Sequence, residues 1–119
     1  MSRREKRVRD EAAAQLAAGV ACYGLGVRPE EILGEERGSV EVAFARQVAM
    51  YLCHTAFELS LTRVAVAFGR DRSTVAHACH AIEDRRADGQ FDLWIGALEA
   101  LLYDPPAPTR AAPLVRGRP

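Results

Sequence analysis

Apolar residues recur every three to four positions along most of the chain, which is the spacing of an amphipathic α-helix. No segment alternates apolar and polar residues as a half-buried strand does. Glycines, prolines and capping residues divide the pattern into six segments: residues 4–23, 27–34, 42–57, 61–68, 72–87 and 90–103. The pattern therefore predicts an all-α domain of about six helices.

Several of the predicted helices carry an apolar stripe that we expect to face the core. The stripes are Ala12, Leu16, Val20 and Tyr23 in the first helix, Val75, Cys79 and Ile82 in the fifth, and Phe91, Trp94, Leu98 and Leu101 in the last. The first helix is also long and rich in alanine. A surface for a partner helix is therefore an alternative use of it.

Composition divides the chain into three parts. Residues 1–10 are strongly basic, and we expect them to be partly disordered or to begin the first helix. Residues 11–104 form the predicted folded domain. Residues 105–119 are rich in proline and arginine, which predicts a disordered tail. A chain of 119 residues is long enough for one such domain and too short for two.

Charge and cysteine content narrow the class of protein. Sixteen basic and sixteen acidic residues cancel, so a DNA-binding surface must come from the local placement of charge. Cys22, Cys53 and Cys79 lie among apolar residues without a paired spacing, which favours buried free thiols and a cytoplasmic protein. The chain shows no secretory signal and no apolar run of ~20 residues, so we expect no membrane partner.

Residues 60–83 have the organisation of a helix-turn-helix. Gly69 breaks the helical pattern, and Asp71 is a good N-cap residue for the helix that follows. Arg72, Ser73 and Thr74 fill the first turn of that helix, with apolar residues behind them. A recognition helix presents polar residues to the major groove in this way, so the segment predicts binding to double-stranded DNA.

An ordered series of short motifs resembles the C-terminal DNA-binding domain of the bacterial replication initiator DnaA. The motifs are residues 45–52 (ARQVAMYL), 59–61 (LSL), 67–71 (AFGRD), 73–75 (STV), 77–79 (HAC) and 82–83 (IE). The resemblance covers residues 12–103. It implies a six-helix domain that reads a short initiator box, acts in the control of replication initiation and carries no cofactor.

The resemblance also implies a set of DNA contacts. In the family the start of the recognition helix reaches base edges and phosphate, and an Arg-Gln pair on the preceding long helix adds further contacts. The matching residues here are Arg46, Gln47, Arg70, Asp71, Arg72, Ser73 and Thr74. Ser and Thr can bond phosphate or base edges, and Arg can bond guanine through two nitrogens, so these residue types suit the role.

The chain departs from the family pattern at three places. It has one glycine, Gly69, where the family has two, and Arg72 where the family has a histidine. The family's loop before the long helix is basic and sends an arginine into the minor groove, whereas residues 34–41 here hold three acids and one base. The minor-groove position falls on Gly38, and the neighbouring Arg37 is an additional candidate contact.

Enzymatic chemistry has no supporting motif. The chain lacks the G-x-x-x-x-G-K-[ST] loop of a nucleotide-binding fold, so we expect neither ATP hydrolysis nor a nucleotide partner. The spacing of three between His77, His80 and Glu83 places them on successively different faces of one helix, so they do not converge on a metal. We expect His77 to be packed or hydrogen-bonded and His80 to face solvent or phosphate.

Two functions from different classes remain open. The first is a DNA-binding regulator of replication initiation, or of transcription, that occupies initiator sites or competes for them in the nucleoid. The second is a protein-interaction module that binds the initiator or its regulatory proteins. The acidic loop at residues 35–41 is the feature that separates them, because acidic side chains repel the DNA backbone.

Overall fold

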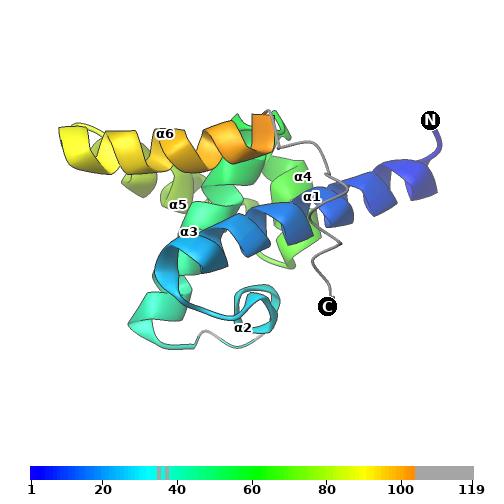
Figure 1. The fold of residues 1–119 in the computed structure, drawn as a ribbon. Helices are drawn as coiled ribbons and strands as arrows, with labels where there is room; N and C mark the ends of the chain where they lie inside the picture. The colour runs from blue at the N-terminus through cyan, green and yellow to red at the C-terminus, as the bar shows by residue number, and fades with distance from the viewer. Residues whose placement is uncertain (35, 37, 104–119) are drawn as a thin grey trace, which may run out of the picture.

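The computed structural model describes residues 1–34, 36 and 38–103. Six α-helices follow one another, and the described part of the chain holds no strand: α1 (Arg3–Leu25), α2 (Pro29–Leu33), α3 (Val40–Thr55), α4 (Leu61–Phe68), α5 (Arg72–Arg85) and α6 (Gly89–Tyr103) (Figure 1). The predicted all-α class and helix number are confirmed. The predicted tail at residues 105–119 lies outside the described residues.

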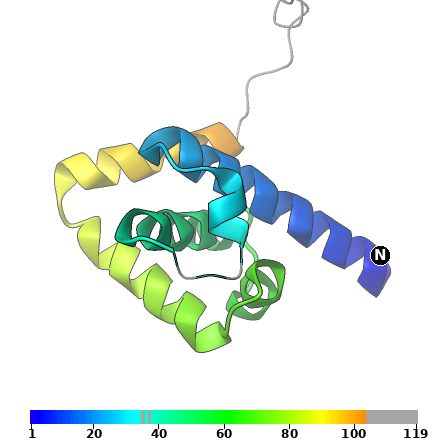
Figure 2. The ribbon, with the colours of Figure 1, turned by 90° about the horizontal axis from the view of Figure 1, so that it is seen from below.

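Helix α3 is the centre of the domain. It packs on α1 and α5 and also touches α2, α4 and α6. Its side chains Val48, Leu52 and Cys53 are fully buried, as a helix surrounded by others requires. Helices α1 and α6 lie together at one side of α3, and α5 and α4 lie at the other (Figure 2).

Helix α1 buries a different face from the predicted one. Its buried side chains are almost all alanine: Ala13, Ala14, Ala17, Ala18 and Ala21, followed by Cys22. Leu16 and Tyr23 of the predicted stripe are instead 57% and 83% exposed. Small side chains let the backbones of α1 and α3 approach closely, and that approach buries α1 on its alanine face.

The basic residues 3–9 belong to α1. Ser2 caps the helix, because its Oγ accepts from the amide of Glu5 at 3.1 Å while the Glu5 carboxylate accepts from the amide of Ser2 at 2.9 Å. This reciprocal pair satisfies two of the amides that a helix start leaves unbonded. The first turns of α1 project beyond the other helices (Figures 1 and 2).

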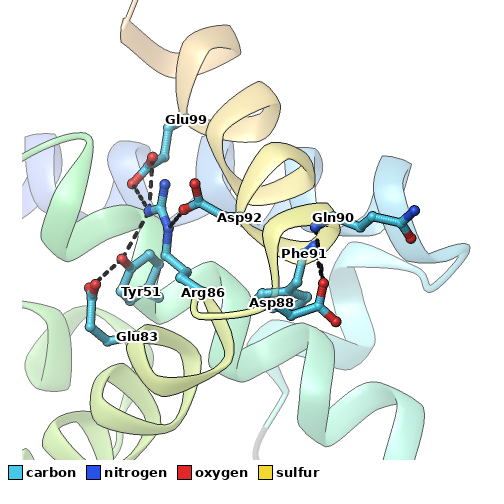
Figure 3. A network of polar contacts seen from close by, with 8 residues as sticks. All are labelled: Tyr51, Glu83, Arg86, Asp88, Gln90, Phe91, Asp92 and Glu99. Carbon is cyan, nitrogen blue, oxygen red and sulfur yellow. Dashed lines mark hydrogen bonds and ion pairs between the residues drawn. The ribbon is translucent and has the colours of Figure 1, made fainter.

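A polar network around Arg86 holds α6 against α3 and α5 (Figure 3). Arg86 Nε donates to Asp92 Oδ1 at 2.5 Å, and Nη1 donates to Glu99 Oε1 at 3.1 Å. The same Nη1 donates to the Tyr51 hydroxyl at 3.0 Å, and that hydroxyl donates to Glu83 Oε1 at 2.7 Å. Burial raises the pKa of Tyr51 to about 12, so the hydroxyl keeps its proton for this bond.

The apolar side of α6 also differs in part from the prediction. Ile95 and Leu98 are buried, whereas Leu101 is 40% exposed. Trp94 lies over Gly24 of α1, where an added Cβ would come within 3.0 Å of the indole ring. Phe91, Trp94 and Leu102 are partly buried against the same core. Three of the four residues of the predicted stripe therefore face the core, and Leu101 does not.

Candidate nucleic-acid interface

Three residues, Gly69, Arg70 and Asp71, join α4 to α5. Helix α4 begins after Ser60, whose Oγ accepts from the Arg63 amide at 3.2 Å, as predicted for a capping serine. It ends at Gly69, which has the left-handed φ of 64° that only glycine adopts without cost. The single glycine is thus sufficient for the turn.

The N-terminus of α5 is open. Arg72, Ser73 and Thr74 are all exposed, while Val75 and Cys79 behind them are buried. Asp71 occupies the N-cap position, but its carboxylate accepts no bond from the helix. The amides of Arg72, Ser73 and Thr74 therefore have no acceptor among the described residues. Helices α1, α3 and α4 differ, because a serine caps each of them.

An open groove runs between α3 and the start of α5. Its lining is Ala43, Arg46, Gln47, Met50, Arg70, Ser73, Thr74, His77 and Ala78. The groove brings together most of the residues that the resemblance implies. Asp71 and Arg72 are not part of its lining but precede it at the exposed start of α5.

His77 belongs to this groove as well. The sequence predicted a packed or hydrogen-bonded residue, whereas the side chain is exposed and lies one turn after Ser73. The spacing of four between Ser73 and His77 is the signal that places both on one face of a helix. His80 is exposed, as expected.

Arg46 lines the groove wall but is only 5% exposed. Its Nε donates to the Ile32 carbonyl at 2.8 Å, and its Nη2 donates to the carbonyls of Glu31 and Glu36, each at 2.9 Å. Burial, together with the neighbouring charge of Arg70, lowers the pKa of Arg46 from its usual value. The guanidinium thus holds the chain around α2 rather than pointing at solvent.

The end of α2 explains this use of Arg46. A helix leaves its last carbonyls unbonded, and many helices cover them with a left-handed residue. Gly34 after α2 is instead extended, with φ −73° and ψ 168°, so α2 has no cap of that kind. Arg46 supplies donors to this end, and Arg70 Nη2 adds one to the Gly34 carbonyl at 2.9 Å.

The connector between α2 and α3 keeps its acidic character in the structure. Glu36 and Glu41 are exposed, as is Glu30 on α2. Gly38 has a φ of 78°, and a Cβ added there would lie 2.8 Å from Val42 Cγ1. The position where the family has its minor-groove arginine is therefore suited only to glycine in this backbone. Arg37 lies outside the described residues.

The three cysteines are buried and unpaired, as predicted. Burial raises the pKa of the Cys53 thiol to about 12 and that of Cys79 to about 11, which keeps both protonated at neutral pH. Among the described residues, no helix is long and apolar enough to cross a membrane.

The sequence matches proteins of one kind. Residues 18–82 match the family described as the bacterial dnaA protein helix-turn-helix. The chain is 41% identical over 86 residues to chromosomal replication initiator protein DnaA 2 of Chlamydia caviae. The aligned residues cover 72% of this chain and 18% of that protein. It is 37% identical over 92 residues to the DnaA initiator of Aquifex aeolicus, covering 76% and 23% respectively.

Two solved structures have the same arrangement of helices. One is described as a DNA replication initiation factor, with a TM-score of 0.72 and 30% identity over 86% of this chain and 31% of that one. The other is the replication initiator DnaA bound to AMPPCP and single-stranded DNA, with a TM-score of 0.72 and 28% identity over the same shares. The chain spans about a fifth of the length of the curated relatives.

The fold and the exposed start of α5 define a helix-turn-helix domain. The match over residues 18–82 and the identity to the curated initiators also identify the family. The chain belongs to the family of the bacterial DnaA helix-turn-helix domain.

Proposed function

We propose that the chain binds double-stranded DNA through the start of α5 and the groove between α3 and α5. It acts in the nucleoid as a regulator of replication initiation, or of transcription, by occupying initiator-box sites or competing for them. No catalytic step is part of this function. Membership of the DnaA helix-turn-helix family supports the proposal, since the curated relatives are replication initiators.

The open N-terminus of α5 is the observation that carries the proposal. Its amides have no acceptor among the described residues, and the positive end of the helix dipole adds to their pull on an anion. Arg72, Ser73 and Thr74 stand exposed around them. A phosphate oxygen of the DNA backbone, or an acceptor atom on a base edge, can accept hydrogen bonds from these groups.

The residues at the start of α5 and in the groove divide into two roles. Arg72 reaches the major groove and bonds guanine or grips phosphate, while Thr74 presents a hydroxyl and a methyl group to the bases. Asp71 makes no capping bond, so its carboxylate is available to accept from a cytosine amino group. Ser73, Gln47 and His77 line the groove and bond the backbone beside it.

Arg46 and Arg70 have a supporting role in this proposal. Both donate to carbonyls at the end of α2, and so they fix the connector relative to the recognition helix. Arg70 is also half-buried, with Nη1 donating to the Phe68 carbonyl at 3.0 Å. They position the groove wall, and Arg70 adds positive charge at the turn.

Fluorescence anisotropy of labelled duplexes across a salt series tests the function. One duplex carries the initiator box and the other a scrambled box. Tighter binding to the box, by about tenfold or more at ~0.15 M salt, supports a site-specific regulator. Equal binding to both, lost steeply with salt, contradicts site occupancy and leaves only electrostatic attraction. The absence of binding at low salt contradicts DNA binding altogether.

A second function, binding to the initiator or its regulatory proteins, is favoured by the acidic connector. Exposed Glu36 and Glu41 repel phosphate, and Gly38 offers no side chain to the minor groove. Pull-down of purified initiator proteins after nuclease treatment separates this function from the first. Retention without DNA supports the second function, and loss on nuclease treatment supports the first.

Reversing the charge of the connector should strengthen DNA binding. We expect the double variant Glu36→Lys, Glu41→Lys to bind box DNA about tenfold more tightly, because two repulsive side chains become two phosphate contacts. The slope of log affinity against log salt should steepen by about one to two units. The matched control, Glu58→Lys with Asp84→Lys, makes the same change in net charge at exposed positions that line neither the groove between α3 and α5 nor the pocket beside the turn between α4 and α5. An equal gain in both variants would show that only net charge matters.

A further inference from the structure

A second groove lies between the first half of α1 and the connection from α3 to α4. Lys6, Arg9, Ala12 and Leu16 of α1 form one wall, and Phe57 and Leu59 of the connection form the other. We call it the α1 groove. Ala12 and Leu16 belong to the stripe that the sequence predicted to be buried. The fold leaves them exposed, and they line this groove instead.

The lining of the α1 groove combines apolar side chains, which we call the apolar floor, with two cations, Lys6 and Arg9. Leu16 is 57% exposed and Phe57 is half-buried, so both keep apolar surface in contact with water. Lys6 and Arg9 are exposed and form no ion pair within the described part of the chain. Further arginines, Arg4 and Arg7, lie on the same turns of α1 but outside the groove.

The one acid in the groove is already neutralised. Asp10 is buried and accepts from Arg63 at both oxygens, from Nη2 at 2.6 Å and from Nε at 2.9 Å. This two-bond pair has the geometry of the strong Arg–carboxylate pairs and fixes α1 to α4. The charges of Asp10 and Arg63 cancel, so Lys6 and Arg9 give the residues that line the groove a net positive charge. Glu58 is exposed beside the opposite wall but is not among these residues.

The opposite wall is held rigidly. Between Phe57 and Leu59 lies Glu58, whose φ of 58° is a left-handed conformation that non-glycine residues seldom adopt. Two bonds fix Leu59: its amide donates to the Cys53 carbonyl at 3.3 Å, and its carbonyl lies 2.7 Å from His54 Nδ1. The surrounding structure thus maintains a costly backbone at this wall. Leu59 packs in the core at 6% exposed, and Phe57 stays half-buried at the groove.

The α1 groove is separate from the proposed DNA surface. Helix α4 lies between α1 and α5 and packs on both (Figure 2). The α1 groove shares no lining residue with the groove between α3 and α5. A molecule in the α1 groove therefore leaves the start of α5 open. Both surfaces can be occupied at the same time.

We propose that the α1 groove binds an acidic amphipathic segment of a protein partner. Its carboxylates pair with Lys6 and Arg9, and its apolar side chains cover Leu16 and Phe57. An amphipathic helix that carries apolar residues at every third and fourth position is the form that such grooves accept. A nucleic-acid backbone would satisfy the cations but would offer nothing to the apolar floor, so the protein segment fits the groove better.

The probe is a fluorescein-labelled helical peptide of about 14 residues, roughly 20 Å long, with leucine on one face and glutamate on the other. Its binding to the full chain is measured by anisotropy at ~0.15 M salt. We expect Lys6→Glu with Arg9→Glu to weaken the binding at least about tenfold. Arg4→Glu with Arg7→Glu makes the same charge change on the same helix and should weaken it less than about threefold.

One further variant and two further probes complete the experiment. Leu16→Ser should also weaken the binding, and circular dichroism checks that each variant keeps its helical content. A peptide with lysine in place of glutamate should not bind. The proposal is overturned if both charge-reversal pairs act alike, if the lysine peptide binds equally, or if the glutamate peptide does not bind. Displacement of the peptide by a scrambled duplex, with the same dependence on Lys6 and Arg9, would assign the groove to nucleic acid and overturn it too.

Discussion

Replacing Arg72 and Thr74 together with alanine will reduce affinity for box DNA by about 100-fold, which corresponds to roughly 3 kcal/mol shared between two base contacts. Both side chains are exposed at the open start of α5, and neither holds the fold together. Alanine is a good helix former, so the free energy of unfolding should change by less than about 1 kcal/mol. Anisotropy with box DNA and urea unfolding measure the two quantities.

The control for this double variant removes a similar set of groups elsewhere. Arg4→Ala with Gln90→Ala takes one cation and one polar side chain from exposed positions on α1 and α6. We expect its affinity for box DNA to fall by less than about threefold. If the Arg72, Thr74 variant is folded and keeps its affinity, the start of α5 is not the DNA-binding surface.

Replacing Arg46 with alanine will destabilise the domain by about 3 kcal/mol. The substitution leaves the carbonyls of Glu31, Ile32 and Glu36 without this donor. The bond to Ile32 is buried and the other two are partly buried; a buried carbonyl without a donor costs ~1–3 kcal/mol, and a partly buried one costs less. For a domain of this size, such a loss lowers Tm by about 12–24 °C. Arg46→Lys should recover only part of the loss, because an ammonium cannot reproduce the planar fork of donors. Thermal and urea unfolding provide the measurements.

A variant of the neighbouring Gln47 distinguishes a role in stability from a role in DNA binding for the Arg-Gln pair. Gln47 is half-buried and lines the groove, and no bond from its side chain supports α2. Gln47→Ala should therefore change the unfolding free energy by less than about 0.5 kcal/mol and weaken DNA binding. If Arg46→Ala instead leaves stability intact and abolishes binding, Arg46 is a direct contact, as the family resemblance implied.

Capping residues and glycines made most of the fold predictable. Ser60 and Gly69 mark the ends of α4, and Asp71 marks the start of α5, because each residue suits only one place at a helix end. The apolar spacing of Val75 and Ile82 also indicated the buried face of α5 correctly. Local signals of this kind depend on neighbouring residues alone, so the sequence reports them directly.

Features that depend on distant residues were not predictable in this way. In α1 alanines surround the helix, so no contrast in hydropathy marks the face that α3 covers, and the larger Leu16 and Tyr23 gave a misleading stripe. Arg46 is buried by α2, whose short length and extended C-cap leave carbonyls that accept from Arg46 and Arg70, at least 14 residues further along the chain. Neither fact has a local signature.

The dependence of α2 on α3 sets the order in which the domain can assemble. A helix of five residues is far below the length at which an isolated helix persists in water. Among the described residues, side-chain donors to the end of α2 come from Arg46, which needs α3 in place, and from Arg70, which needs the turn between α4 and α5. We therefore expect α2 to form late in folding and its backbone amides to exchange with solvent well before those of α3.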